Sequence, residues 1–194
     1  MNYPLDLSFK IISWGPQVRL IDKFGQTSMF IKQKALALKE SVRVFADEGQ
    51  QQVLFEIAAD RVIDFNANYS ITDSVGRKVG VVRRQGMRSF WKVTYSITDS
   101  DGNEVGLIHE ENPWTKVADG LLNHIPLVGS VLGLFVNPAY LVKLNNTTVM
   151  HLMKKPALLE GKFVLDKRSD ISDQEESLLL CSVIMMLLLE RKRG

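Results

Sequence analysis

A duplicated 14-residue segment is the feature that most constrains the fold of this chain. Residues 69–82 read YSITDSVGRKVGVV, residues 95–108 read YSITDSDGNEVGLI, and nine of the 14 aligned positions are identical. In each copy apolar and polar residues alternate up to Asp, which is the period of a half-buried β-strand. Asp and Gly then supply turn chemistry, because Asp bonds local backbone groups and Gly adopts positive φ without steric cost. The duplication therefore predicts two copies of one β-hairpin.

Weaker copies of the hairpin flank the duplication on both sides. They have the same order of alternating run, turn and second run at 19–31, 42–57 and 140–152. The alternating segment 5–11 and the segment 162–165 add one strand each. Together these segments predict about 12 antiparallel strands. An open sheet of that length would leave exposed edges, whereas a closed up-and-down barrel has none, so we expect a mainly β fold with a closed barrel.

The C-terminal part predicts a helix at about 173–190 that fills the barrel. Ser172 and Glu175 have the spacing of a capping box. Residues 178–189 read LLLCSVIMMLLL, which is apolar on every side of a helix, and such a helix has to be buried all round. We therefore expect it to run through the barrel centre, with Cys181 as an inert core residue. The 12-residue apolar run spans about 18 Å, too short for a bilayer core of about 30 Å.

The repeated hairpins and the apolar helix together resemble a known family. Hairpins of the form Tyr-x-Ile-x-Asp-x-x-Gly-x-x-Val-Gly, followed by such a helix, are similar to the tubby C-terminal-like superfamily, in particular its LURP-one-related and phospholipid-scramblase-like branches. The resemblance covers about 19–189 and is strongest at 69–108 and 160–189. It implies a 12-stranded barrel around a central helix, no catalytic residues, and anionic phospholipid binding, membrane tethering or lipid movement. The length of 194 residues fits a single domain over 1–194. The Cys-rich and Pro-rich segments of eukaryotic scramblases are missing from this sequence, which argues against scrambling.

Composition and charge exclude several function classes. The 194 residues include 24 Lys+Arg and 22 Asp+Glu, a net charge of +2. A general nucleic-acid coat needs a large basic excess, so no nucleic-acid partner is favoured. One cysteine leaves no internal disulfide, and the first residues lack the basic and apolar regions of a secretory signal. We therefore expect a cytoplasmic protein, which in the lipid-binding hypothesis lies peripherally at the inner membrane face.

A basic segment is the candidate lipid-binding site. No acidic residue occurs from 77 to 92, and the aromatic pair 90–91 lies among the cations. Each cation near an anionic leaflet contributes about 1 kcal/mol, and an interfacial aromatic ring inserts, so the expected ligand is a phosphoinositide or phosphatidylserine. An ordinary solvated face, offset by Asp60, Asp64 and Asp73, explains the same pattern. The candidate residues are Arg77, Lys78, Arg83, Arg84, Arg88, Trp91 and Lys92.

The turn of the second copy carries a weak candidate for a calcium site. Its oxygen-bearing residues occupy positions 1, 3, 5 and 12 of an EF-hand loop. However, Glu104 occupies position 6, where that loop needs Gly, and the residues on both sides alternate as in strands and not as in helices. The sister copy builds the turn at Asp73 without the extra carboxylate. A plain hairpin turn is therefore the favoured interpretation, with weak calcium binding as the alternative. The candidate ligands are Asp99, Asp101, Asn103 and Glu110.

The segment 112–138 interrupts the series of hairpins and suggests a second class of function, protein interaction. Its part 125–136 is apolar and punctuated by Gly. We expect this segment to cap one end of the barrel, and the alternatives are docking on a protein partner or dipping into a membrane surface. In the alternative hypothesis the chain is a protein-interaction or scaffold domain that uses 112–138 and has no lipid role.

The sequence contains no recognised catalytic or cofactor motif. The three histidines are far apart without the spacing of a zinc site, and there is no nucleophile elbow, P-loop or dinucleotide fingerprint. A barrel that is filled by a helix also leaves little room for a substrate. We therefore expect no enzyme activity and no cofactor, and we predict a non-enzymatic module that binds anionic phospholipid surfaces.

Overall fold

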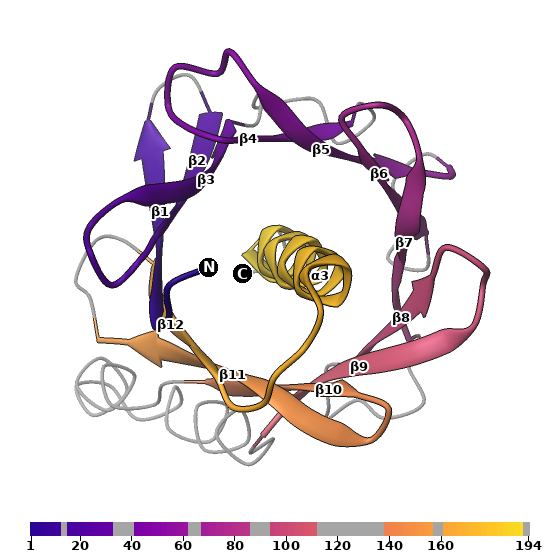
Figure 1. Cartoon of the computed structure of the whole chain (residues 1–194). Coiled ribbons are helices and arrows are strands. Elements are labelled where there is room, and N and C mark those ends of the chain that lie inside the picture. Colours follow the sequence, from indigo (N-terminus) through magenta and orange to yellow (C-terminus); the bar gives the residue numbers. More distant parts are fainter. Residues whose placement is uncertain are drawn as a thin grey trace, which may run out of the picture.

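The described part of the chain forms a closed antiparallel barrel. In the computed structural model twelve strands, within the ranges given below, are each hydrogen-bonded to their neighbours in sequence, and β1 pairs with β12 to close the circle (Figure 1). This confirms the prediction of a mainly β fold with a closed barrel of about 12 strands. The described residues are 1–12, 15–32, 41–61, 67–85, 94–111, 138–156 and 161–191. The strands are β1 (Leu5–Ile12), β2 (Gly15–Ile21), β3 (Thr27–Lys32), β4 (Val42–Phe45), β5 (Val53–Ala59), β6 (Asn68–Asp73), β7 (Lys78–Arg84), β8 (Thr94–Asp99), β9 (Glu104–Glu110), β10 (Ala139–Leu144), β11 (Thr147–Lys155) and β12 (Gly161–Lys167).

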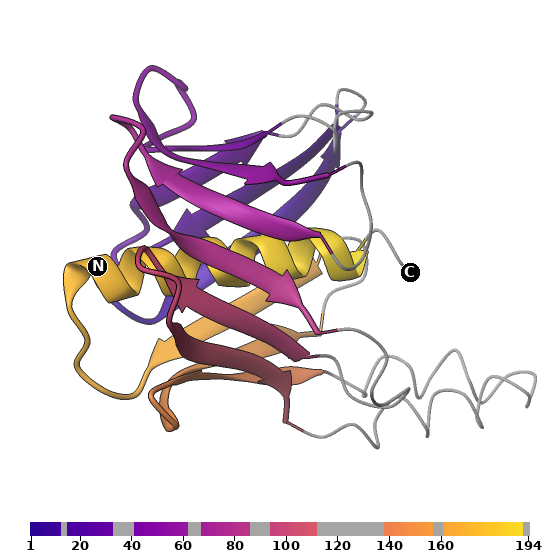
Figure 2. The ribbon, with the colours of Figure 1, turned by 90° about the vertical axis from the view of Figure 1, so that its right-hand side faces the viewer.

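The two ends of the barrel differ in their connections. The short turns at 22–26, 46–52, 74–77, 100–103 and 145–146 all lie at one end, here called the hairpin end. The other end, here called the open end, has the strand ends from which the remaining connections between strands begin. Figure 2 shows the hairpin end on the left and the open end on the right.

The duplicated hairpins turn as their sequence predicts. Oδ1 of Asp73 accepts hydrogen bonds from the backbone N–H groups of Val75 and Arg77, at 3.0 and 2.8 Å. Oδ1 of Asp99 accepts the equivalent bonds from Asp101 and Asn103, both at 2.9 Å. The glycines that follow, at positions 76 and 102, have φ angles of 82° and 92°, which a residue with a side chain rarely adopts.

The helix α3 (Asp173–Arg191) runs along the barrel axis, from the hairpin end to the open end (Figures 1 and 2). It begins with the predicted capping box, since the N–H and Oγ of Ser172 donate to Oε2 of Glu175 at 2.8 and 2.7 Å. Residues 178–189 are all buried, and burial raises the pKa of the Cys181 thiol. The predicted helix is therefore confirmed to within one residue. Among the described residues no helix is long and apolar enough to span a membrane.

A glycine in β7 lets α3 approach the barrel wall. A Cβ atom at Gly80 would lie 2.6 Å from Cδ1 of Leu178 in α3 and would also collide with the carbonyl oxygen of Thr98. The equivalent Gly106 of the second copy faces a similar restriction, because a Cβ there would lie 2.9 Å from the carbonyl oxygen of Lys143. The Val-Gly pair shared by both copies therefore serves close packing.

We predict that Gly80→Ala lowers the free energy of unfolding by about 1–3 kcal/mol, because Leu178 and the backbone of β8 have to move. Gly161→Ala is the matched control, since its added Cβ would meet its nearest neighbour at an ordinary 3.6 Å. Urea denaturation of both variants measures the difference. Equal stability of Gly80→Ala and the wild type would contradict the close approach.

Candidate functional site

The predicted basic site is divided between the two ends of β7. Arg77 and Lys78 lie at the hairpin end, whereas Arg83 and Arg84 lie at the open end. The length of the strand separates the two pairs by about 20 Å, at about 3.3 Å per residue. The four described cations therefore do not form one patch. The remaining candidates, Arg88, Trp91 and Lys92, lie outside the described residues, as does 112–137 of the predicted cap.

Alternation along β7 also separates Arg83 from Arg84. Arg83 is exposed on the outer face of the barrel. The Arg84 side chain is only 13% exposed, and its Nε lies 3.4 Å from Oε1 of Glu190 at the end of α3. The Tyr95 hydroxyl donates a hydrogen bond to the same oxygen at 2.8 Å. The structure thus places Arg84 in an interior polar cluster that holds the end of α3, and not on the outer surface with Arg83.

Two further polar residues belong to this interior cluster. Tyr140 and Glu110 are cross-strand partners in β10 and β9, and both are buried. Burial and the negative charges of Glu110 and Glu190 raise the pKa of Tyr140. Burial and the charge of Glu190 likewise raise the pKa of Tyr95, so both phenols stay protonated at neutral pH.

The candidate calcium ligands are not brought together. Asp99, Asp101 and Asn103 lie in the turn at the hairpin end, whereas Glu110 is fully buried at the open end of β9. Hydrogen bonds from the backbone and the side chain of Asn103 lower the pKa of Asp99, whose oxygens already serve the turn. Across the described ranges no group of three or more His, Cys, Asp or Glu side chains is placed to hold a metal ion. The geometry supports the plain hairpin turn.

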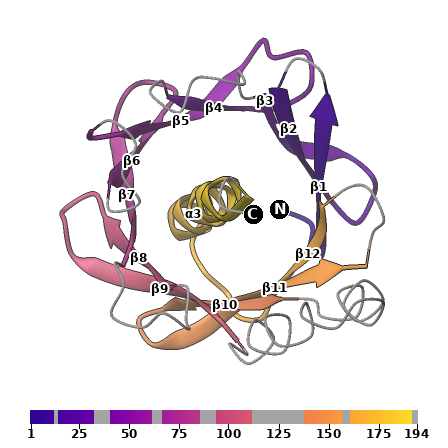
Figure 3. The ribbon, with the colours of Figure 1, turned by 180° about the vertical axis from the view of Figure 1, so that it is seen from behind.

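Exposed cations instead lie along much of the open end, which faces the viewer in Figure 3, although none of the described ones belongs to β8, β9 or β10. They come from six different parts of the barrel, and we call them the open-end ring. Arg43, Arg61 and Lys155 of this ring have carboxylate partners at 3.9, 3.2 and 2.9 Å. The other three have no ion pair with any described carboxylate. The open-end ring consists of Lys32, Arg43, Arg61, Arg83, Lys155 and Lys162.

At the hairpin end exposed acidic residues outnumber exposed cations by six to four, whereas at the open end the six cations outnumber the exposed Asp60 and Glu111. Arg77 at the hairpin end is paired with Asp73 at 2.8 Å. Sequence analysis missed this polarity because each strand contributes one or two charges, and only the order of turns tells which end a residue occupies. The exposed acidic residues of the hairpin end are Asp47, Glu48, Asp101, Glu104, Asp170 and Asp173, and its exposed cations are Lys23, Arg77, Lys78 and Arg168.

Comparison with known proteins gives a match to the family of LURP-one-related proteins. Residues 27–111 match the model of the LURP-one-related family. The match confirms the predicted resemblance to this branch of the tubby-like superfamily. The LURP-one-related segment runs from β3 to the end of β9 and contains both duplicated hairpins, while α3 and the other strands complete the barrel outside it. No curated protein and no solved structure matches the chain.

We predict that Arg84→Glu lowers the free energy of unfolding by about 3 kcal/mol, because it breaks a largely buried pair and sets two carboxylates against each other. Arg83→Glu is the matched control, with the same change of charge on the neighbouring residue, and it should stay within about 0.5 kcal/mol of the wild type. Urea denaturation compares the two. A similar small effect of both substitutions would contradict the placement of Arg84 inside the barrel.

Proposed function

We propose that this chain is a non-enzymatic binding module that associates peripherally with anionic phospholipid surfaces through the open end of its barrel. The observation that carries the proposal is the open-end ring, which gathers exposed cations from six parts of the barrel. The match of residues 27–111 to the LURP-one-related family is consistent with a binding module. The cytoplasmic leaflet carries the anionic lipids of a cell membrane, so the proposed location is the inner membrane face.

The shape of the ring suits a flat partner. Cations at one end of a barrel meet a plane at the same time, whereas cations along the side of a single strand do not. Each cation near an anionic leaflet contributes about 1 kcal/mol, so the three cations without an ion pair contribute about 3 kcal/mol. That amount gives weak and reversible association. Because exposed charges are screened over about 8 Å at physiological ionic strength, salt should release the protein.

The arrangement of the ring favours binding to the overall charge of an anionic membrane over recognition of one particular lipid headgroup. Lys32, Arg83 and Lys162 belong to β3, β7 and β12, which are spread around the barrel. Separate cations neutralise several lipids and do not enclose a single phosphate. Phosphatidylserine and phosphoinositides are both proposed ligands on this basis, and vesicles that contain one or the other distinguish them.

We predict that the purified protein sediments with vesicles of phosphatidylcholine that contain phosphatidylserine or a phosphoinositide, and not with phosphatidylcholine alone. Arg83→Glu/Lys162→Glu should weaken binding by at least about 30-fold, since two contributions of about 1 kcal/mol are lost. Arg77→Glu/Lys78→Glu changes the net charge equally at the hairpin end and should bind as the wild type does. High salt should abolish binding, and calcium should have no effect.

Two outcomes would overturn this proposal. Equal loss of binding in both double variants would mean that the net charge of the protein determines binding, and not the cations of the open end. A wild-type protein that stays in the supernatant under every condition would favour the alternative of a scaffold domain, whose partner binds through 112–138. Pull-down with a chain that lacks the apolar 125–136 part then tests that alternative.

A further inference from the structure

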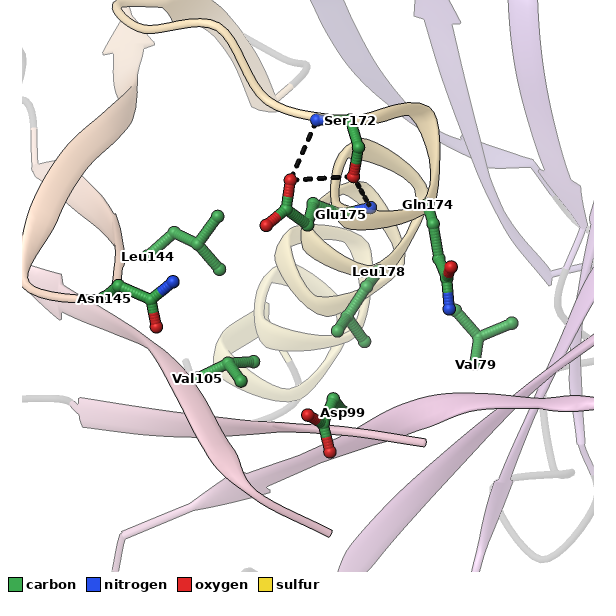
Figure 4. Close-up of a pocket in the computed structure, with 9 residues that line it drawn as sticks. All are labelled: Val79, Asp99, Val105, Leu144, Asn145, Ser172, Gln174, Glu175 and Leu178. Carbon is green, nitrogen blue, oxygen red and sulfur yellow. Dashed lines mark hydrogen bonds between the residues drawn. The ribbon is translucent and has the colours of Figure 1, made fainter. Parts of the chain in front are cut away.

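A pocket at the hairpin end lies between the first turn of α3 and strands β7 to β10 (Figure 4). Its volume is about 270 Å³. Four apolar side chains line it, two from the Val-Gly pairs of the duplicated hairpins and two from β10 and α3. These residues are Val79, Val105, Leu144 and Leu178.

The rim of the pocket is negatively charged. Glu175 projects from α3 on one side, and Asp99 of β8 lies across the pocket from it (Figure 4). Hydrogen bonds from the side chain and the backbone of Ser172 lower the pKa of Glu175, and those from Asn103 lower the pKa of Asp99. Both groups are therefore ionised at neutral pH. No Lys or Arg is among the described residues that line this pocket.

Each carboxylate has acceptor capacity left for a ligand. The hydrogen bonds of Glu175 are made by Oε2, and Oε1 has no hydrogen bond among the described residues. Oδ2 of Asp99 accepts one bond, from the side chain of Asn103 at 3.1 Å. A carboxylate oxygen accepts more than one hydrogen bond. The pocket thus offers two separate acceptors above an apolar lining.

The size of the pocket limits what it can hold. Sites for drug-sized ligands have about 300–1,000 Å³, and this pocket falls just below that range. A single extended side chain is a better fit. Its stem has to be apolar, to cover the lining. A positive tip is attracted to the ionised Asp99 and Glu175, whereas a negative tip is repelled and an uncharged tip gains no such attraction.

We infer that this pocket takes a lysine side chain presented by a partner protein. The alkyl stem lies against Leu144 and Leu178, and the ammonium group donates to Asp99 and Glu175. Lysine fits better than arginine because its three donors rotate freely toward acceptors on different elements, whereas the planar fork of a guanidinium matches the paired oxygens of one carboxylate. The pocket lies at the opposite end from the open-end ring, so it stands independently of the proposed lipid binding.

The test uses hexylammonium as a mimic of the lysine side chain. Titration into the ¹⁵N-labelled full chain should shift the amide resonances of Val105, Asn145 and Ser172 in a saturable manner. Hexanol has the same stem without the charge and should bind about tenfold more weakly, while hexanoate should not bind. Equal binding of hexanol and hexylammonium would overturn the inference, because the carboxylates would then play no part.

Three substitutions locate the binding charge. Glu175→Gln keeps the capping box, which accepts Gln at this position, and Asp99→Asn keeps an oxygen for the backbone bonds of the turn. The double variant should bind hexylammonium about tenfold more weakly. Asp73→Asn makes the same change in the sister hairpin, outside this pocket, and should bind as the wild type does. Unchanged affinity in the double variant, or equal loss in Asp73→Asn, would overturn the assignment.

Discussion

The burial of α3 inside the closed barrel is the constraint on which the rest of this structure depends. A barrel of eight strands is about the size that its own side chains can fill, so a barrel of twelve needs another element in its interior. A helix that is apolar on all sides has to be enclosed by other elements, which here are the strands of the barrel wall. Residues 178–189 are buried on every side, and neither the helix nor the wall is stable without the other.

Polar residues fix the position of α3 along the barrel. At the hairpin end Glu176 accepts from Lys167 at 3.3 Å and from the amino group of Met1 at 3.1 Å. At the open end Glu190 accepts from Tyr95 at 2.8 Å. These polar contacts add to the close packing of Leu178 against Gly80 in setting the position of α3 along the barrel. Glu176 and Glu190, near the two helix ends, thus serve the fold.

The fold was predictable because its signals are local. Alternation, turn residues and the capping box each act within a few positions, and together they gave the hairpins, the closed barrel and α3. The site was less predictable because strand neighbours face opposite sides, so Arg83 and Arg84 belong to different surfaces. The alternation that places Val82 in the core places Arg84 there too, and this signal was open to sequence analysis. Lys32 and Lys162 come to the same end through the order of turns along the whole chain, which no single local pattern encodes.

Only some of the charges that distinguish the two ends of the barrel stabilise α3. Acidic residues in the first turn of α3 and Arg191 in its last turn oppose the helix dipole and stabilise it. That effect fades within one turn of the helix end, and exposed charges beyond about 8 Å are screened. Arg83 is exposed on the outer side of the barrel wall, so it adds little to α3. Stability of the helix therefore does not account for the cations of the open-end ring, which supports the proposed contact with an anionic surface.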